Sequence, residues 1–178
     1  MGNPFSKLFA SRMELPALET TTSRAEGGDA QAQFSLGVKF AHDGATQDYP
    51  QAAQWYLKAA GQNHALAQFN LSVMYARGQG VPRDDKQSLV WIRKAAHLGD
   101  PGAQFNLGMR QHRISMDGLA EDAGESRIEA YKWLRLAATQ GYGASEASCE
   151  CVALQMTREC VADANRRAAA FVAGPKED

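Results

Sequence analysis

Two short phrases recur three times along the chain at a nearly constant spacing. The first reads Ala-Gln-Phe, any residue, Leu and a small residue, and the second reads Trp, three residues and two alanines. They open at Ala32, Ala67 and Ala103 and at Trp55, Trp91 and Trp133. Copies of the first phrase are 35 and 36 residues apart, and the tryptophans are 36 and 42 residues apart. Self-similarity at this period predicts a stacked array of helical repeats, whose extended surface typically holds another protein.

Each repeat is expected to be a pair of helices. Apolar residues of the first phrase follow helical spacing, as at Leu71, Met74 and Tyr75. A glycine inside a helix costs roughly 0.5–1 kcal/mol relative to alanine, so small residues in register imply that the partner helix approaches closely. These small residues are Gly37, Ser72 and Gly108. In the second helices we expect Trp91 to be largely buried between repeats.

Capping residues mark where the second helices begin and end. A good N-cap stands seven residues before each tryptophan, and a Gln or Glu follows three residues later, which completes a capping-box pattern. The pairs are Asp48 with Gln51, Asp84 with Gln87, and Ser126 with Glu129. Residues that tolerate the left-handed conformation end these helices, and they are Asn63, Gly99 and Gly141.

A fourth, degenerate helix pair follows Gly141. Glu146 and Cys149 stand where the repeat phrase has Gln and Leu, and Thr157 is placed to cap a last helix through about Val172. Terminal repeats are atypical because one face meets water instead of a neighbour. We therefore expect a C-terminal capping pair in which Cys149 is a buried core thiol.

The third repeat is longer than the others. From Phe105 to Ser126 the chain advances 21 residues, against 14 and 15 over the same interval in the first two repeats. We expect the surplus to form a loop around Met116–Glu125, whose acids are Asp117, Glu121, Asp122 and Glu125. Such insertions often lie on a binding face, and they are equally often surface length without a role.

The chain before the first repeat has an apolar part and a polar part. Phe5, Leu8, Phe9 and Met13 form one potential apolar stripe, and the polar residues 19–24 have the composition of a linker. We expect the stripe to dock on the array, either over the exposed side of the first repeat or in a groove. The domains are then an N-terminal segment and linker (1–24), the repeat domain (25–172) and a short tail (173–178).

Composition excludes several functional classes. The chain has 19 Lys and Arg against 20 Asp and Glu, which gives no electrostatic footprint for nucleic acid. No apolar run approaches the roughly 20 residues of a membrane span, and the first residues lack a secretion-signal layout. Met1–Ser6 matches an N-myristoylation pattern, but the pattern is short and requires a eukaryotic enzyme. We expect a cytoplasmic protein without membrane association.

The sequence gives no sign of catalytic, cofactor or metal chemistry. Cys149, Cys151 and Cys160 are three thiols without a histidine after His112, whereas a closed thiolate site normally needs four ligands. The glycines of residues 78–80 lie between helices and not after a strand, unlike a phosphate loop. His64 and His97 are expected near the ends of second helices, where a cation favours the helix dipole. We expect no enzyme, no cofactor and no metal.

The repeat phrases resemble those of the Sel1-like repeat family, a relative of tetratricopeptide repeats. Ala67–Leu71, Gly78–Asp84 and Trp91–Ala96 match most fully, residues 49–60 and 126–138 match the second helix, and the resemblance covers about residues 25–172. It implies an all-α fold, an α/α solenoid of three clear repeats plus the degenerate C-terminal pair. The segment 156–159 is similar to C-terminal caps of bacterial members. The third repeat departs from the pattern, because Gln111 replaces an aromatic residue, so we expect it to pack differently.

The resemblance also implies an interaction surface. In tetratricopeptide-like pairs the first helices line the concave face, and three rungs at i, i+4 and i+8 would lie there. We call these residues the first-helix stripe, and they are Phe34, Val38, His42, Phe69, Val73, Arg77, Phe105, Met109, His112 and Arg113. Three phenylalanines with a cationic edge suit an amphipathic helix or an extended peptide with acidic residues. The rings could equally pack between neighbouring repeats.

Two functions are consistent with this pattern, because family members act as adaptors, regulators, virulence factors and toxin-neutralising proteins. The first is a non-enzymatic adaptor that binds a peptide or protein on the concave face. The second is a dedicated inhibitor or immunity-type protein that occludes one toxin or enzyme, through the acidic loop of the third repeat.

Overall fold

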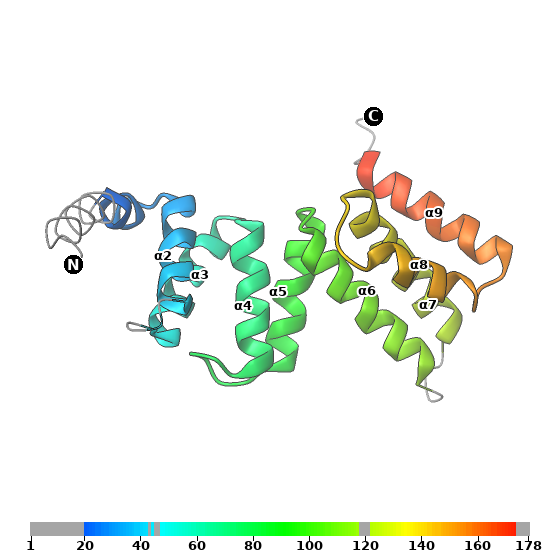
Figure 1. Ribbon diagram of the computed structural model, residues 1–178, viewed down its shortest axis with the longest axis horizontal. Helices are drawn as coiled ribbons and strands as arrows, with labels where there is room; N and C mark the ends of the chain where they lie inside the picture. Colours follow the sequence, from blue (N-terminus) through cyan, green and yellow to red (C-terminus); the bar gives the residue numbers. More distant parts are fainter. Residues whose placement is uncertain (1–19, 43, 45–46, 118–121, 174–178) are drawn as a thin grey trace, which may run out of the picture. The chain divides into compact units, whose positions relative to one another are not determined.

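The computed structural model describes residues 20–42, 44, 47–117 and 122–173, and these residues form helices and connecting turns without a β-strand (Figure 1). Residues 20–26 are helical. The helices that follow are α2 (Ala30–His42), α3 (Tyr49–Gly61), α4 (Ala65–Arg77), α5 (Asp85–His97), α6 (Pro101–Met116), α7 (Ala123–Thr139), α8 (Ser145–Ala153) and α9 (Arg158–Ala173). The expected all-α helical-repeat fold is confirmed.

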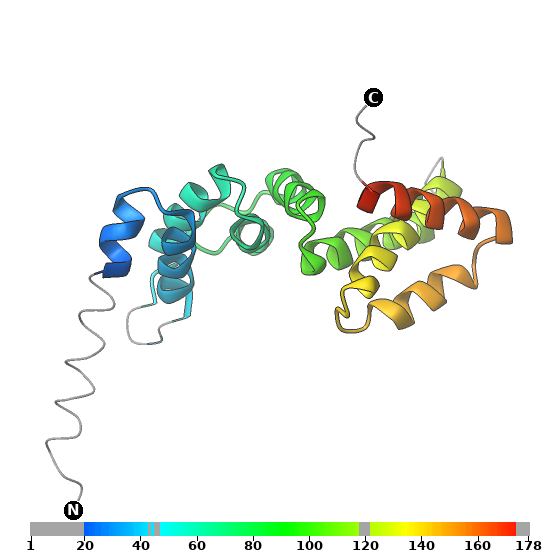
Figure 2. The same cartoon turned by 90° about the horizontal axis from the view of Figure 1, so that it is seen from above.

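The chain divides into two compact units, Met1–Trp91 and Ile92–Asp178. In the first unit, α3 contacts both α2 and α4, and its Tyr56 lies in the core with Leu71 and Met74 of α4. In the second unit, α7 contacts α6, α8 and α9, and Figure 2 shows it between α8 and α9. Within each unit, the second helices α3 and α7 are thus shared between two first helices or their equivalents, as in a stacked array.

The glutamine of the first phrase is a buried connector between successive helix pairs. Its side-chain Nε2 donates to the backbone carbonyl eight residues earlier, in the last turn of the preceding helix. The three bonds are Gln33 to Ala25 (3.0 Å), Gln68 to Ala60 (3.0 Å) and Gln104 to Ala96 (3.2 Å). In the first and third repeats a second amide completes the link, because Gln62 donates to Gln33 Oε1 and Gln140 to Gln104 Oε1, each at 2.9 Å.

The glycines of the first phrase mark the close approach of the two helices of a repeat, as predicted. A Cβ on Gly37 would lie 2.5 Å from the ring of Tyr56, and one on Gly108 would lie 2.7 Å from Leu134 Cγ. Neither distance is compatible with a real side-chain contact, so glycine is required for the helices to touch. Asn63, Gly99 and Gly141 all have the predicted positive φ.

Two of the three predicted caps of the second helices are confirmed and one is wrong. Asp48 accepts from the Gln51 amide, and Asp84 accepts from the Gln87 amide, each at 2.9 Å. In the third repeat the cap is Asp122, which accepts from the Glu125 amide at 3.0 Å, and not Ser126. An aspartate placed four residues earlier lets the helix begin a turn sooner, because Asp and Ser are comparable N-caps.

The surplus of the third repeat lengthens its helices and does not form the expected loop over Met116–Glu125. Helix α6 continues to Met116 and α7 begins at Ala123, so both exceed the 13 residues of α2 to α5. Asp117 ends α6 and Glu125 lies in the first turn of α7, whereas Glu121 falls outside the described residues.

The degenerate fourth pair is present as α8 and α9. Cys149 is buried in the core of the second unit with Val152 and Ala164, and Thr157 Oγ1 accepts from the Cys160 amide to cap α9. Burial raises the pKa of the Cys149 thiol to about 11, which is consistent with a structural residue and not a reactive thiolate.

One expectation about local structure is wrong, and the expected burial of Trp91 is met in part. Residues 20–24, read as linker, belong to the helical segment 20–26, whose Ala25 is buried against Ala32 and Leu36. Trp91 packs on the core of the first unit but keeps part of its surface exposed, whereas Trp133 is only 3% exposed. The apolar stripe Phe5–Met13 and the Met1–Ser6 pattern lie outside the described residues.

Candidate protein-interaction surface

Three residues of the first-helix stripe meet at one pocket of the first unit. His42 comes from the end of α2, Val73 and Arg77 come from α4, and they line a pocket of about 190 Å³. These residues belong to two different repeats, so the pocket joins the first and second rungs of the predicted surface. Its wall also contains residues that sequence reasoning missed, namely Ala41, Tyr49, Tyr56, Asn70, Met74 and Gln79.

The pocket combines an apolar floor with a polar, cationic rim. None of its nine lining residues is an acid, and the Arg77 guanidinium has no ion pair within the described part of the chain. The Tyr49 hydroxyl accepts a hydrogen bond from Gln47 Nε2 at 3.0 Å, which fixes one side of the rim. Burial raises the pKa of Tyr56, and a hydrogen bond with Asn70 opposes that shift. Such a site favours an anionic group attached to an apolar one.

A glycine in the α4–α5 turn brings the pocket's loop wall close to α3. Gly80 has a φ of +71°, and a Cβ there would lie 2.2 Å from the Tyr49 carbonyl oxygen. The turn can therefore pack against the start of α3 only with glycine at this position. Gln79, the preceding residue, consequently lies at the pocket together with Tyr49.

The phenylalanine rings of the first and third rungs pack against the start of the next repeat. Phe34 stacks on His64 with ring centroids 4.6 Å apart, and the ring centroids of Phe105 and Tyr142 are 5.6 Å apart. His64 and Tyr142 occupy equivalent positions, each directly after the left-handed residue that ends a second helix. The two rings remain partly exposed, so packing between repeats accounts for much of their surface and leaves an edge available.

His64 is the N-cap of α4, and the expectation of a helix-dipole role for this residue is wrong. Its Nδ1 accepts from the Ala67 amide at 3.3 Å, and Nε2 lies 3.1 Å from Gln31 Oε1. A neutral ring with the proton on Nε2 satisfies both contacts. Burial lowers the pKa of His64, which also favours the neutral form. Asp29 and Asp100 cap α2 and α6 at the equivalent positions, a regularity that the sequence contains and that was missed.

The remaining stripe residues differ in how much they are exposed. Val38 and Phe69 are partly buried, and Val38 packs on the first core. On α6, Met109 and Arg113 are exposed and His112 is partly buried, with an Nδ1 that has no hydrogen-bond partner within the described residues. The added turn of α6 contributes Met116, which is 61% exposed and extends this rung.

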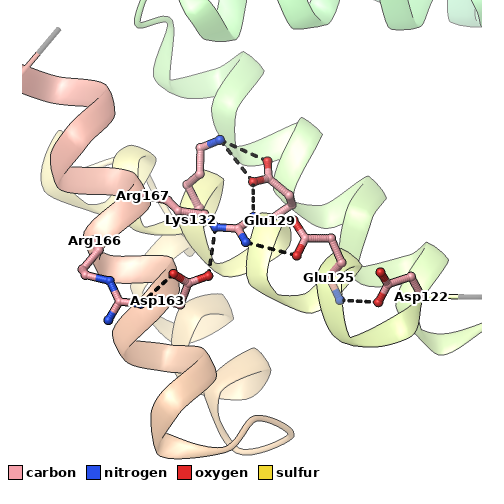
Figure 3. A network of polar contacts seen from close by, with 7 residues as sticks. All are labelled: Asp122, Glu125, Glu129, Lys132, Asp163, Arg166 and Arg167. Carbon is pink, nitrogen blue, oxygen red and sulfur yellow. Dashed lines mark hydrogen bonds and ion pairs between the residues drawn. The ribbon is translucent and has the colours of Figure 1, made fainter. Parts of the chain in front are cut away.

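The acids of the third repeat are largely engaged within the second unit (Figure 3). Glu125 and Glu129 both bind Arg167 of α9, with Arg167 Nη2 3.1 Å from Glu125 Oε2 and Nη1 3.3 Å from Glu129 Oε1. Arg167 Nε lies 2.9 Å from Asp163, and Lys132 pairs with Glu129 at 3.1 Å. Two of the four acids assigned to an occluding loop, Asp122 and Glu125, therefore cap α7 or hold α9.

The described residues carry neither a cluster of metal-ligating side chains nor a helix suited to span a membrane. They contain no group of three or more His, Cys, Asp or Glu side chains placed to hold a metal ion. None of their helices is both long and apolar enough to cross a membrane.

The sequence matches the family model of the Sel1 repeat three times, over residues 30–64, 65–100 and 101–142. A curated relative is the ERAD-associated E3 ubiquitin-protein ligase component HRD3A of Arabidopsis thaliana, with 36% identity over 61 residues. The match covers 34% of this chain and 9% of that protein, so the chain spans a small part of this relative.

Two solved structures resemble this one. A protective antigen of uropathogenic Escherichia coli strains, which displays an SLR fold, matches with a TM-score of 0.68 and 34% identity over 84% of this chain and 33% of that chain. A Sel1 repeat protein from Oxalobacter formigenes matches with a TM-score of 0.64 and 34% identity over 75% of this chain and 97% of that chain. Both comparisons support the helical-repeat architecture over most of the chain.

Proposed function

Because the chain belongs to the Sel1 repeat family, we propose that it is a non-enzymatic module that binds a peptide or protein partner on the concave side of its repeats. Sel1 repeat proteins generally mediate protein–protein interactions. The proposal places the contact on the first-helix stripe and assigns the protein no catalytic role. We place this activity in the cytoplasm.

One observation carries the proposal, namely the pocket that joins His42 with Val73 and Arg77. The three residues come from two rungs, the first and the second, which were assigned to one surface. Arg77 stands at an edge without an ion pair in the described structure, next to the apolar Val73 and Met74. Exposed arginine beside apolar surface is the composition that binding hot spots favour.

The partner that fits this pocket presents an acidic side chain next to an apolar one. The carboxylate would lie at Arg77 and His42, where an arginine can bind it in a bidentate manner. The apolar neighbour would cover Val73 and the partly exposed rings of the stripe. A pocket of about 190 Å³ has room for one such side chain and not for a whole helix.

The alternative, an inhibitor or immunity-type protein acting through the acidic loop, receives less support. Its Glu125 is paired with Arg167 and its Asp122 caps α7, so both carboxylates already have a role within the second unit. Among the described residues, Asp117 and Asp122 are the exposed acids of this segment, and Asp122 is the one that caps α7.

The experiment compares two arginines against a partner captured from the source cell by affinity pull-down and identified by mass spectrometry. Arg77→Gln is expected to weaken binding by about thirtyfold, since loss of a hot-spot anchor costs about 2 kcal/mol. Arg83→Gln is the matched control, because Arg83 is also exposed but pairs with Asp85 and does not line the pocket. Phe69→Ala should weaken binding as well, and raised salt should mimic Arg77→Gln because an exposed cation is screened.

The competing surface is tested with Asp117→Asn combined with Glu121→Gln, which leaves the cap Asp122 and the paired Glu125 intact. Normal binding by Arg77→Gln and Phe69→Ala, with loss of binding in this acidic double variant, would replace the concave-face proposal by the inhibitor alternative. Unchanged binding in all variants would place the contact on the second helices.

A further inference from the structure

The helical segment 20–26 takes the place of a second helix in front of the first repeat. Gln33 Nε2 donates to the Ala25 carbonyl in the same way as the equivalent glutamines of the next two repeats bind α3 and α5. Ala25 is buried against Ala32 and Leu36 of α2, as Ala60 is buried against the core that contains Leu71 of α4. Residues 20–26 therefore cover α2 from the side on which α3 covers α4.

This cover is incomplete where the segment has small side chains. When Ala25 is aligned with Ala60, Thr21 takes the position of Tyr56, a ring that is 2% exposed and fills the next core. Beside this position lies a pocket of about 250 Å³. It is lined by Thr22, Leu36, Lys39, Phe40, Gln51 and Trp55. Phe40 and Trp55 pack on the small core around Ala25 and keep part of their rings exposed.

We propose that residues 5–13 of the same chain bind in this pocket, with Phe9 and Leu8 as the inserted side chains. The segment lies outside the described residues, and its sequence supplies the chemistry, because Phe5, Leu8, Phe9 and Met13 share one face at helical spacing. The pocket exceeds the roughly 150 Å³ of a cavity that takes benzene, so an aromatic ring and an aliphatic side chain fit together.

The tether makes the chain's own segment the favoured occupant. Met13 precedes Thr22 by nine residues, and an extended chain reaches about 3.3 Å per residue, or about 30 Å in total. Thr22 itself lines the pocket, so the reach is ample. A segment held by a short linker has an effective concentration in the millimolar range, which a partner in solution rarely matches.

This inference is independent of the partner surface proposed above, because the two pockets share no residue. It assigns residues 5–13 a role as the outer cover of the first repeat. Arrays of this kind need a terminal element that buries the apolar face on one side and presents a polar face to water.

The test is amide hydrogen exchange on the full-length chain with a matched pair of substitutions. Phe9→Asp and Ser11→Asp introduce the same charge two residues apart, which places them on opposite faces of a helix. Phe9→Asp is expected to accelerate exchange at least tenfold in residues 5–13 and around residues 36–40 and 51–55. Ser11→Asp should leave those rates unchanged, and residues 145–173 serve as the internal reference in both variants.

A crosslinking experiment identifies the occupant directly. Photoreactive benzoylphenylalanine incorporated at Phe9 is expected to link to peptides containing Phe40 or Trp55 within one chain, independently of protein concentration. Links between chains of different isotopic mass would show that a second copy occupies the pocket and would overturn the intrachain assignment. Rapid exchange throughout residues 5–13 in the unmodified protein, or equal effects of the two aspartates, would overturn the docking itself.

Discussion

At the scale of single residues, specific glycines and glutamines allow the helix pairs to stack. Gly37 and Gly108 remove a side chain where two helices touch, and Gln33, Gln68 and Gln104 bind the backbone of the preceding helix. In the second repeat, Leu98 stands at the sequence position that Gln62 and Gln140 occupy in the other two. Gln68 Oε1 is buried and, among the described residues, has no hydrogen-bond partner.

Gly37→Ala should destabilise the first unit by about 1–3 kcal/mol, the usual cost of overpacking a core. The new methyl group would lie 2.5 Å from the buried ring of Tyr56, which Gly37 and its neighbours hold in place. Gly61→Ala is the matched control, because a Cβ at Gly61 meets nothing within 4 Å. This control should be neutral or stabilising by up to about 1 kcal/mol, since alanine is the better helix former. Urea unfolding measures both, and equal effects would disprove the packing role.

His64 should make the stability of the first unit sensitive to mild acid. Burial lowers its pKa below the unfolded value of about 6.5, so the unfolded state binds more protons as the pH falls through that value. The free energy of unfolding should therefore be lower at pH 5.5 than at pH 7.5. His64→Asn retains a capping side chain without the titration, and it should lose this part of the pH dependence. An unchanged pH dependence in His64→Asn would contradict the assignment.

At the scale of the elements, the sequence predicts helix starts well where a single cap is available. Asp48 and Asp84 each stand alone before their helices, and both predictions are confirmed. In the third repeat Asp122 and Ser126 compete, and local pattern cannot rank two good caps one turn apart. Helix α7 begins at the earlier cap, and from there Glu125 and Glu129 both reach Arg167. These contacts join residues 42 and 38 positions apart, so the repeat pattern of the sequence does not predict them.

The candidate site, too, is predicted only in part by the sequence pattern. Val73 and Arg77 follow from helical spacing on α4, and His42 follows from the equivalent position on α2. Helical spacing does not predict Tyr49 and Gln79, because these residues reach the pocket from the start of α3 and from a turn. Their placement depends on the contact of Gly80 with the Tyr49 carbonyl, which is a tertiary approach without a period in the sequence.

The last helix should be held to α7 by charge as well as by apolar contact. Arg167→Met keeps much of the apolar stem but removes the links to Glu125, Glu129 and Asp163, and we expect it to cost about 1 kcal/mol in the second unit. Arg166→Met is the matched control, because Arg166 is 71% exposed and pairs with Asp163 alone. The difference should shrink in 0.5 M salt. Urea unfolding is the appropriate measurement, because guanidinium chloride is itself a salt. Equal losses of unfolding free energy in the two variants would contradict a stabilising role of the network.

At the scale of the whole molecule, Trp133 is the aromatic residue on which the second unit depends. Its ring lies 5.2 Å from both His97 and Phe171, so it joins the ends of α5 and α9 to α7. Trp133→Ala should cost about 3–5 kcal/mol, as truncation of large buried aromatics does. Trp55→Ala should cost less, since its ring is partly exposed.

Hydrogen exchange in Trp133→Ala should show how destabilisation spreads through the array. Each repeat contacts only its neighbours, so protection should fall most in α6 to α9 and least in α2 and α3. Uniform loss of protection along the chain would mean that the molecule unfolds as one cooperative block.

The buried glutamines also bear on how such a chain can change length. Each of them binds a main-chain carbonyl of the preceding helix, and every residue type has that acceptor. The junction therefore makes little demand on which side chains the neighbour carries. After duplication or deletion of a repeat, the new neighbours could form this hydrogen bond without further substitutions. The array could therefore become longer or shorter without compensating changes at this bond.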